Sequence, residues 1–306
     1  MIVIVCPGQG SQTPGFLTPW LEHDVYRDQL VGISQAIGVD LVAHGTVSDS
    51  DTIRDTAVAQ PLIVAAGLIT LSTLLADGRR DRIGGVAGHS VGEITAATAS
   101  GVLDPLDAMK LVNARAKAMA DAAALDRTGM SAVVGADEDE LLTLLRELGL
   151  EPANFNGGGQ IVVAGTLDAL DKLRSAPPSG ARVIPLQVAG AFHTRYMIPA
   201  VDRLRAVAAT ISPRDPIVPL WSTHAGELVT GGAECLDLIV GQVSSPVRWD
   251  HTMRSLQEAG VTGIVELAPA GALVGLAKRS LPGVASVAVK TPDDLAAAID
   301  LIDGNS

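Results

Sequence analysis

The sequence predicts an α/β fold with a mainly parallel sheet, interrupted by a smaller inserted subdomain. Short apolar runs alternate with helical patterns along most of the 306 residues, as they do when parallel strands are joined by helices. Because 47% of the residues are hydrophobic, the chain can bury a large core. The pattern changes between residues 129 and 188, which is where we expect the insertion.

The main domain is predicted from strands and helices on both sides of that segment. The apolar stretch IVIVC leads into the glycine-rich loop PGQGSQTPG, a long helix follows near residues 57–76, and IGGVAG forms a second short strand. Residues 92–100 are expected to be helical. Asp104 is expected to cap a further helix, which has Pro105 in its first position and runs to about residue 124. Later strands are expected near residues 217–222, 263–268 and 285–289.

The inserted segment is predicted to fold as a β-α-β-β-α-β unit. Its elements are expected in GMSAVVGA, DEDELLTLLRELG, PANFN, QIVVAG, TLDALDKLRSA and ARVIPLQV, in that order. This order is the split βαβ pattern of a small sandwich. We therefore divide the chain into a main domain, residues 1–127 and 192–306, and an inserted subdomain, residues 128–191.

The net charge argues against nucleic-acid binding, and the spacing of the cysteines and histidines argues against a metal site. The chain has 22 basic and 34 acidic residues and a net charge of −12, whereas nucleic-acid binding needs a basic surface. Cys6 and Cys235 lack metal-ligand spacing and are predicted to be free thiols in a reducing compartment. The histidines form no pair such as H-x-H or H-x-x-x-H, so we expect no metal site.

Residues 56–76 carry no charge and are long enough to cross a bilayer. We nevertheless predict a buried helix of a soluble protein, because the run contains Gln60, Pro61 and Gly67 and lacks basic or aromatic anchors. The first residues also lack the basic region and cleavage site of a signal peptide. We therefore expect a cytoplasmic protein with no membrane partner.

The stretch GHSVG, residues 88–92, has the G-x-S-x-G pattern of a serine nucleophile. Its glycines permit a sharp strand-to-helix turn that exposes the hydroxyl of Ser90. The amide of Val91, at the start of the helix, would point toward an oxyanion on the attacked carbonyl. The pattern by itself is common, and a serine that caps a helix would also explain it. The apolar strand before it and the helix after it favour the nucleophile.

The loop PGQGSQ has two possible explanations. It is not a Rossmann fingerprint, because Thr13 occupies the third glycine position, and it lacks the Lys-Ser/Thr of a phosphate-binding loop. A tight turn after the first strand would account for it. Alternatively, Gln9 supplies its backbone amide as a second oxyanion donor.

Arg115 falls within an apolar stripe of its predicted helix, whereas Lys117 points away toward solvent. The neighbours on the same face are Leu111, Val112, Ala118 and Met119. Burying an unpaired guanidinium would cost on the order of several kcal/mol, so Arg115 needs an anionic partner. A structural salt bridge would supply one. So would a bound carboxylate, whose shape matches the planar fork of arginine.

Five features occur in order along the chain: PGQGSQ, GHSVGE, Arg115, GAFHT and GQVSSPVRW. Together they resemble the malonyl-CoA:acyl-carrier-protein transacylases of fatty acid and polyketide synthesis, especially the discrete actinobacterial enzymes. The resemblance runs nearly end to end. It implies a hydrolase-like α/β core with an inserted ferredoxin-like subdomain. It also implies malonyl-CoA as substrate, acyl carrier protein as partner, and no tightly bound cofactor.

The resemblance implies roles for the residues that match these motifs. Ser90 matches the nucleophile and His193 its general base, in a Ser–His dyad. Gln242 matches the position whose main-chain carbonyl fixes the tautomer of the base. Gln9 and Val91 match the residues whose amides bind the oxyanion. Arg115 matches the cation that binds the malonyl carboxylate.

Further residues near these motifs have expected supporting roles. His89 adjoins the nucleophile, but neighbours at a sharp turn point in different directions, so we expect it to make a supporting hydrogen bond. Phe192 is expected beside the malonyl α-carbon, and Glu93 is expected to cap or support the elbow helix. Arg195 would add positive charge near the mouth, for CoA phosphates or an acidic carrier protein. Asn154 and Asn156 fit either a polar lining or a turn.

The expected reaction is ping-pong transfer of malonyl from malonyl-CoA to the phosphopantetheine thiol of acyl carrier protein, through malonyl-Ser90. Three alternatives remain open. The chain could be a generic serine hydrolase or thioesterase, the malonyl-loading subunit of a malonate decarboxylase, or a non-catalytic module that binds CoA or a carrier protein.

Overall fold

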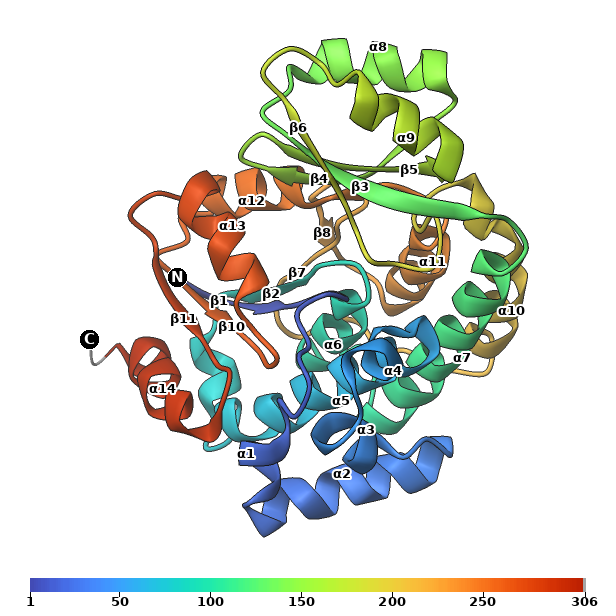
Figure 1. Cartoon of the computed structure of the whole chain (residues 1–306). Coiled ribbons are helices and arrows are strands. Elements are labelled where there is room, and N and C mark those ends of the chain that lie inside the picture. The colour runs from blue at the N-terminus through green and yellow to red at the C-terminus, as the bar shows by residue number, and fades with distance from the viewer. Residues whose placement is uncertain (305–306) are drawn as a thin grey trace.

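The computed structural model describes residues 1–304 and contains two β-sheets with helices packed around them (Figure 1). The larger sheet has six strands in the order β11-β10-β1-β2-β7-β8, and the smaller has five in the order β6-β3-β5-β4-β9. The predicted α/β class is therefore confirmed.

The larger sheet is mainly parallel. Its strands are β1 (Ile2–Cys6), β2 (Gly85–Gly88), β7 (Leu220–Trp221), β8 (Leu228–Val229), β10 (Gly263–Glu266) and β11 (Ala285–Ala288). All neighbouring strands run parallel except β8, which pairs antiparallel with β7. The three later strands expected from the sequence correspond to β7, β10 and β11.

The helices around this sheet come from both ends of the chain. They are α1 (Thr18–Leu21), α2 (Asp24–Ile37), α3 (Leu41–Thr46), α4 (Ser50–Arg54), α5 (Thr56–Leu74), α6 (Gly92–Ala99), α7 (Pro105–Ala123), α10 (Ile198–Ala208), α11 (Gly232–Gln242), α12 (Trp249–Glu258), α13 (Ala272–Ser280) and α14 (Leu295–Asp303). Short 3₁₀ turns are η1 (Arg79–Arg82), η2 (Arg195–Met197) and η3 (Pro292–Asp294). The sequence did not indicate the three helices α1, α2 and α3, and it indicated only a helix start in DSDTIRD, residues 49–55, where α4 lies.

Alternate residues of β1 face two different cores, as the period of a strand requires. Ile4 and Cys6 pack into the large cluster that includes α5 and α6, whereas Val3 and Val5 pack with α12 and α13. Both faces of the sheet are therefore covered, which explains why the sequence of β1 is apolar throughout. Cys6 fills part of this core and is fully buried.

Helix α5 is the one helix within residues 1–304 that is long and apolar enough to cross a membrane. In this fold, however, 78% of its apolar 18-residue stretch is buried among other parts of the protein. Its uniform hydrophobicity reflects a position surrounded by other helices on most sides. The predicted burial of this segment is confirmed.

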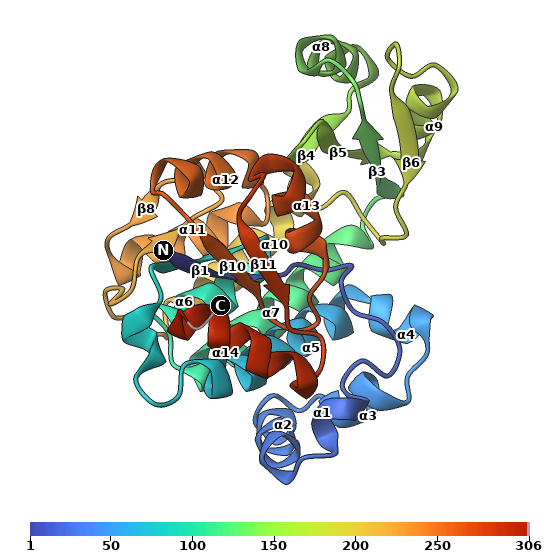
Figure 2. The same cartoon turned by 90° about the vertical axis from the view of Figure 1, so that its left-hand side faces the viewer.

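The second sheet belongs largely to the segment predicted to be inserted, which stands apart in Figure 2. Its elements are β3 (Thr128–Val134), α8 (Glu138–Leu148), β4 (Glu151–Gly157), β5 (Gln160–Thr166), α9 (Leu167–Ser175) and β6 (Arg182–Pro185). The expected order of strands and helices is present. One strand was not expected: β9 (Val247–Arg248) comes from the later chain and pairs parallel with β4. The domain boundaries remain a prediction, and residues 305–306 of the main domain lie outside the described residues.

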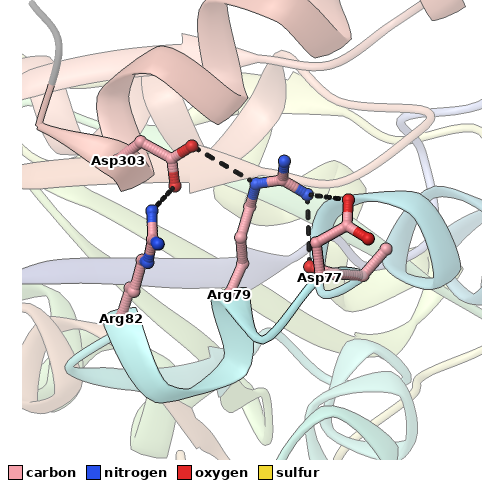
Figure 3. Close-up of polar contacts among 5 residues, drawn as sticks. Asp77, Arg79, Arg82 and Asp303 are labelled. Carbon is pink, nitrogen blue, oxygen red and sulfur yellow. Dashed lines mark hydrogen bonds and ion pairs between the residues drawn. The ribbon is translucent and has the colours of Figure 1, made fainter.

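Ion pairs join the C-terminal helix α14 to the segment around η1, as Figure 3 shows. Asp303, in the last turn of α14, accepts from Arg82 at 2.8 Å and from Arg79 at 3.5 Å. Arg79 also reaches Asp77 at 3.4 Å. Because Asp303 is only 16% exposed, these contacts are better shielded from solvent than ordinary surface pairs.

Glycines at the end of β2 allow the chain to turn tightly over β1. A Cβ on Gly92 would lie 2.1 Å from the carbonyl oxygen of Cys6, and one on Gly88 would lie 2.2 Å from the amide nitrogen of Glu93. Both contacts are with backbone atoms, which a rotamer change cannot relieve. The glycines of GHSVG are therefore required by close packing.

Gly92→Ala is expected to lower the free energy of unfolding by about 2–3 kcal/mol, because the backbone must move to admit the methyl group. Gly32→Ala is the matched control: Gly32 lies on an exposed part of α2, where a Cβ meets nothing within 4 Å, and alanine should stabilise the helix by about 0.5–1 kcal/mol. Chemical denaturation measures both. Equal midpoints for Gly92→Ala and the unsubstituted protein would contradict the packing argument.

Candidate active site

Ser90 lies at the sharp turn between β2 and α6. Its φ is 53°, in the left-handed region that non-glycine residues rarely adopt. Such strained conformations persist only where the surroundings enforce them, and they concentrate at functional sites. The turn lifts the Ser90 side chain clear of the sheet at the start of a helix, as the G-x-S-x-G pattern predicts.

His193 contacts the serine hydroxyl directly. The Ser90 Oγ and His193 Nε2 atoms are 2.7 Å apart. On the other side of the ring, Nδ1 lies 2.8 Å from the main-chain oxygen of Gln242. A carbonyl can only accept, so Nδ1 carries the hydrogen and Nε2 is left free to accept the serine proton.

Burial keeps His193 neutral. Desolvation, followed by the nearby Arg115 cation, lowers the pKa of His193 to about 3. The ring is therefore an uncharged acceptor across the physiological range, which is the state that a general base needs.

Arg115 is 1% exposed and lies behind the serine. Its Nη1 donates to Oε1 of Gln60 at 2.7 Å, and its Nη2 donates to Oε1 of Gln242 at 2.9 Å and to Oγ of Ser90 at 3.4 Å. Its Nε has no hydrogen-bond partner within residues 1–304. Burial lowers the pKa of Arg115 to about 10, so it remains a cation at neutral pH.

No carboxylate within residues 1–304 forms an ion pair with Arg115. The structural salt bridge that the sequence left open is therefore absent from the described chain. All the protein oxygens that contact the guanidinium are neutral amide or hydroxyl oxygens. The arrangement leaves the cation without a direct anionic partner beside the nucleophile, as a site for a carboxylate ligand requires.

The two amides expected to bind an oxyanion lie in loops that meet at the serine. Within the described chain, neither the Gln9 amide nor the Val91 amide donates to another protein group. The Gln9 side chain is held in place, because its Nε2 donates to the main-chain oxygen of Arg54 at 3.2 Å. The next amide, that of Gly10, is already occupied by Gln12 at 2.9 Å. Gln9 and Val91 thus have donors available, while Gly10 has none.

A cleft of about 700 Å³ opens over these groups, with residues of the second sheet forming part of its wall. Its lining includes Gln9, His89, Ser90, Val91, Phe192 and His193. Arg115 and Gln242 are not part of this lining: Arg115 reaches Oγ of Ser90, and Gln242 contacts His193 and Arg115. The structure thus brings together all eight predicted site residues, six on the cleft surface and two in contact with these.

His89 makes the supporting contact expected of it. Its Nε2 lies 2.9 Å from Oδ1 of Asn156, whose Nδ2 donates to Gln160 at 3.0 Å. Its ring also meets the edge of Trp249, with centroids 5.6 Å apart. Asn154 and Asn156 both lie on β4 and line the cleft, so they are lining residues and not part of a turn.

Two residues differ from expectation or were missed. Arg195 was expected to add positive charge near the mouth, but its charge is offset by an ion pair with Glu151, at the start of β4. That partner is remote in sequence, so the local motif could not indicate it. Gln60 was noted only as a polar residue within an apolar run. A buried amide needs partners, and this was the signal that could have indicated its contact with Arg115.

Comparison with known proteins agrees with this geometry. The acyl transferase domain family matches residues 3–291. The malonyl CoA-acyl carrier protein transacylase of Mycobacterium tuberculosis H37Rv is 50% identical over 96% of this chain and 98% of its own length. That of Escherichia coli K12 is 31% identical, over 97% and 98%.

Solved structures give the same result. The crystal structure of MCAT from Mycobacterium tuberculosis superposes with a TM-score of 0.94 at 49% identity, covering 98% of this chain and 99% of that one. A malonyl-transacylase in complex with a type II PKS acyl-carrier protein superposes with a TM-score of 0.92 at 29% identity, with the same coverage. The chain therefore belongs to the malonyl-CoA:acyl-carrier-protein transacylase family of acyl transferases.

Proposed function

We propose that the protein transfers the malonyl group of malonyl-CoA to the phosphopantetheine thiol of acyl carrier protein, for fatty acid or polyketide synthesis. One observation carries the proposal: a neutral base and a buried cation both reach the same serine oxygen. His193 lies 2.7 Å from Ser90 Oγ, and Arg115 lies 3.4 Å from it. The names of the relatives support the donor and the acceptor, and the structure solved with an acyl-carrier protein supports the partner.

In the first half-reaction, Ser90 attacks the thioester carbonyl of malonyl-CoA while His193 Nε2 takes its proton. The amides of Gln9 and Val91 donate to the oxyanion of the tetrahedral intermediate. The C–S bond then breaks, and the proton on His193 passes to the departing sulfur. CoA leaves as the thiol, and malonyl-Ser90 remains.

In the second half-reaction, the same groups act in reverse order. The phosphopantetheine thiol gives its proton to His193 and attacks the ester carbonyl. The C–O bond to Ser90 breaks, and His193 returns the proton to the serine oxygen. Gln242 supports both steps through its main-chain carbonyl, which holds the ring in the tautomer with hydrogen on Nδ1.

Arg115 holds the free carboxylate of the malonyl group during both steps. Its Nε has no partner among residues 1–304, and one of the two bonds from Nη2 is the long contact with Ser90 Oγ, which a carboxylate could replace to engage Nε and Nη2 as a fork. An uncharged acyl group would leave the cation unsatisfied, which disfavours it. Phe192 lines the cleft next to His193 and would limit the space beside the α-carbon.

The geometry favours transfer of a malonyl group over general hydrolysis. A serine hydrolase of the usual kind orients its histidine with a carboxylate, whereas His193 is oriented by a carbonyl and has Arg115 nearby. A malonate decarboxylase subunit would share this site, and a test with different carrier proteins would separate the two. A non-catalytic module would not require the polarised Ser90–His193 contact.

We further propose a hydrolase-like core with a ferredoxin-like insertion, and a cytoplasmic location. The parallel order of the larger sheet and the β-α-β-β-α-β order of the smaller unit support the first. Burial of α5 within the core supports the second. No tightly bound cofactor or metal is needed, because the side chains already supply nucleophile, base and cation.

Mixing the protein with malonyl-CoA is expected to add about 86 Da, the mass of one malonyl group bound covalently. Ser90→Ala removes the attacking oxygen and should give no adduct. Intact-mass spectrometry measures both. An adduct of the same size on Ser90→Ala, or none on the unsubstituted protein, would overturn the proposal.

Arg115→Ala is expected to reduce the preference for malonyl-CoA over acetyl-CoA about 10²-fold or more, because the charge-assisted contact with the carboxylate is lost. The ratio of the two Ser90 acylation rates measures this preference. Lys117→Ala is the control, since Lys117 is an exposed cation on the same helix, and should leave the ratio unchanged. Equal ratios in all three proteins would show that Arg115 does not select the acyl group.

The rate of Ser90 acylation should remain level between pH 8 and pH 6. His193 acts as a base only when neutral, and its pKa of about 3 keeps it neutral throughout this interval. An exposed histidine, with a pKa of about 6.5, would lose its activity as a base as the pH falls through that value. Rapid-quench acylation at a series of pH values tests this, and a fall centred near pH 6.5 would contradict it.

A further inference from the structure

A buried chain of hydrogen bonds leads from Arg115 to a carboxylate that it does not touch. Nη2 of Arg115 donates to Oε1 of Gln242 at 2.9 Å. Nε2 of Gln242 donates to Oγ1 of Thr223 at 3.3 Å, and that hydroxyl donates to Oε1 of Glu93 at 2.7 Å. All four side chains are buried.

The donors and acceptors in this chain of hydrogen bonds can be arranged in one direction only, from Arg115 to Glu93. The Thr223 hydroxyl has one hydrogen, and a carboxylate can only accept it, so the hydroxyl must accept from Gln242. The NH₂ group of Gln242 therefore faces Thr223, and its oxygen faces Arg115. If the amide were reversed, its NH₂ group would point at the guanidinium, and both groups would lack an acceptor.

Glu93 is a fixed end for this chain. Besides the hydroxyl, its Oε1 accepts from the main-chain amide of Thr223 and from Oγ of Ser222, the latter at 3.2 Å. The carboxylate thus anchors the segment that follows β7. Glu93 was expected to support its own helix, α6. It also holds the segment at Ser222 and Thr223, which is remote in sequence.

The indirect connection suits a site that must bind an anion. A direct ion pair would occupy the guanidinium donors that a substrate carboxylate needs. Through Thr223 and Gln242, Glu93 aligns the cation and leaves its Nε without a partner in the part of the chain that the structure describes. Burial raises the pKa of Glu93 overall, while the hydrogen bonds from Thr223 and Ser222 and the charge of Arg115 act in the opposite direction.

We infer that Glu93 is a positioning residue that orients Arg115 for the acyl carboxylate by way of Thr223 and Gln242. This inference rests on the proposed function. Gln242 serves the two halves of the site through different atoms, its main-chain carbonyl for His193 and its side chain for Arg115. Weakening the hydrogen-bond chain from Glu93 to Arg115 should therefore alter the choice of acyl group more than it alters proton transfer at His193.

The test is Thr223→Val, which removes the hydroxyl and keeps the shape. We expect the ratio of malonyl to acetyl loading on Ser90 to fall about tenfold, through a higher KM for malonyl-CoA, in keeping with the loss of one hydrogen bond to a charged group. Thr223→Ser keeps the hydroxyl and should keep the ratio. Thr70→Val is the matched control for a buried threonine outside this hydrogen-bond chain, since its hydroxyl donates to the main-chain oxygen of Ala66 in the same helix.

Glu93→Gln provides a second, independent variant. Its amide oxygen can accept the same three hydrogen bonds but carries no charge, so the ratio should fall about threefold in the same direction. Thermal unfolding shows whether Thr223→Val folds. If it does not fold, the loading ratio of Glu93→Gln tests the inference instead.

An unchanged ratio in Thr223→Val or in Glu93→Gln would overturn the inference. So would an equal loss of malonyl and acetyl loading, since the change would then act on His193. In either case the unsubstituted protein would still form the malonyl adduct, and the proposed function would stand. Failure of the unsubstituted protein to form that adduct would instead overturn the proposed function.

Discussion

The site depends on a guanidinium that is buried next to a serine hydroxyl and has no direct anionic partner among residues 1–304. Such a group is costly to bury unless its donors are satisfied. The protein supplies neutral oxygens from two helices, with Gln60 on α5 and Gln242 at the end of α11. These oxygens orient the cation without neutralising it. The position of Gln242 in turn fixes the ring of His193.

The parallel sheet explains how parts from distant places in the chain meet here. Neighbouring parallel strands end at the same edge of a sheet, where ligands bind in open α/β folds. The loop with Gln9 follows β1, Ser90 follows β2, and Ser222 and Thr223 follow β7, and these three strands are adjacent. The nucleophile, an oxyanion donor and the anchor of Glu93 therefore come from one edge. The tight approach of Gly92 to the end of β1 brings the first two of these loops together.

The nucleophile and the cation could be predicted from the sequence, because each lies in a short pattern with a local cause, whereas the base, His193, was assigned only from the resemblance of GAFHT to a family motif. Glycines surround Ser90, and an apolar helical stripe surrounds Arg115. The partners of these residues were less accessible. The ion pair of Arg195 with Glu151 and the pairing of β9 with β4 join segments remote in sequence. No local periodicity encodes such contacts. Helix α2 was missed even though Tyr26, Leu30 and Ile37 recur at helical spacing and are buried on one face.

Burial has opposite chemical consequences for the two ionisable groups that reach Ser90. Desolvation disfavours the charged form of both, so it lowers the pKa of His193 to about 3 and that of Arg115 to about 10. The ordinary values of the two groups lie on opposite sides of neutrality and far enough apart that the same environment leaves one uncharged and the other charged. A lysine in place of Arg115 would start from a lower value and would be more easily neutralised by the same burial. The dry interior thus provides a base that can accept a proton and a cation that can hold a carboxylate, a few ångströms apart, at one pH.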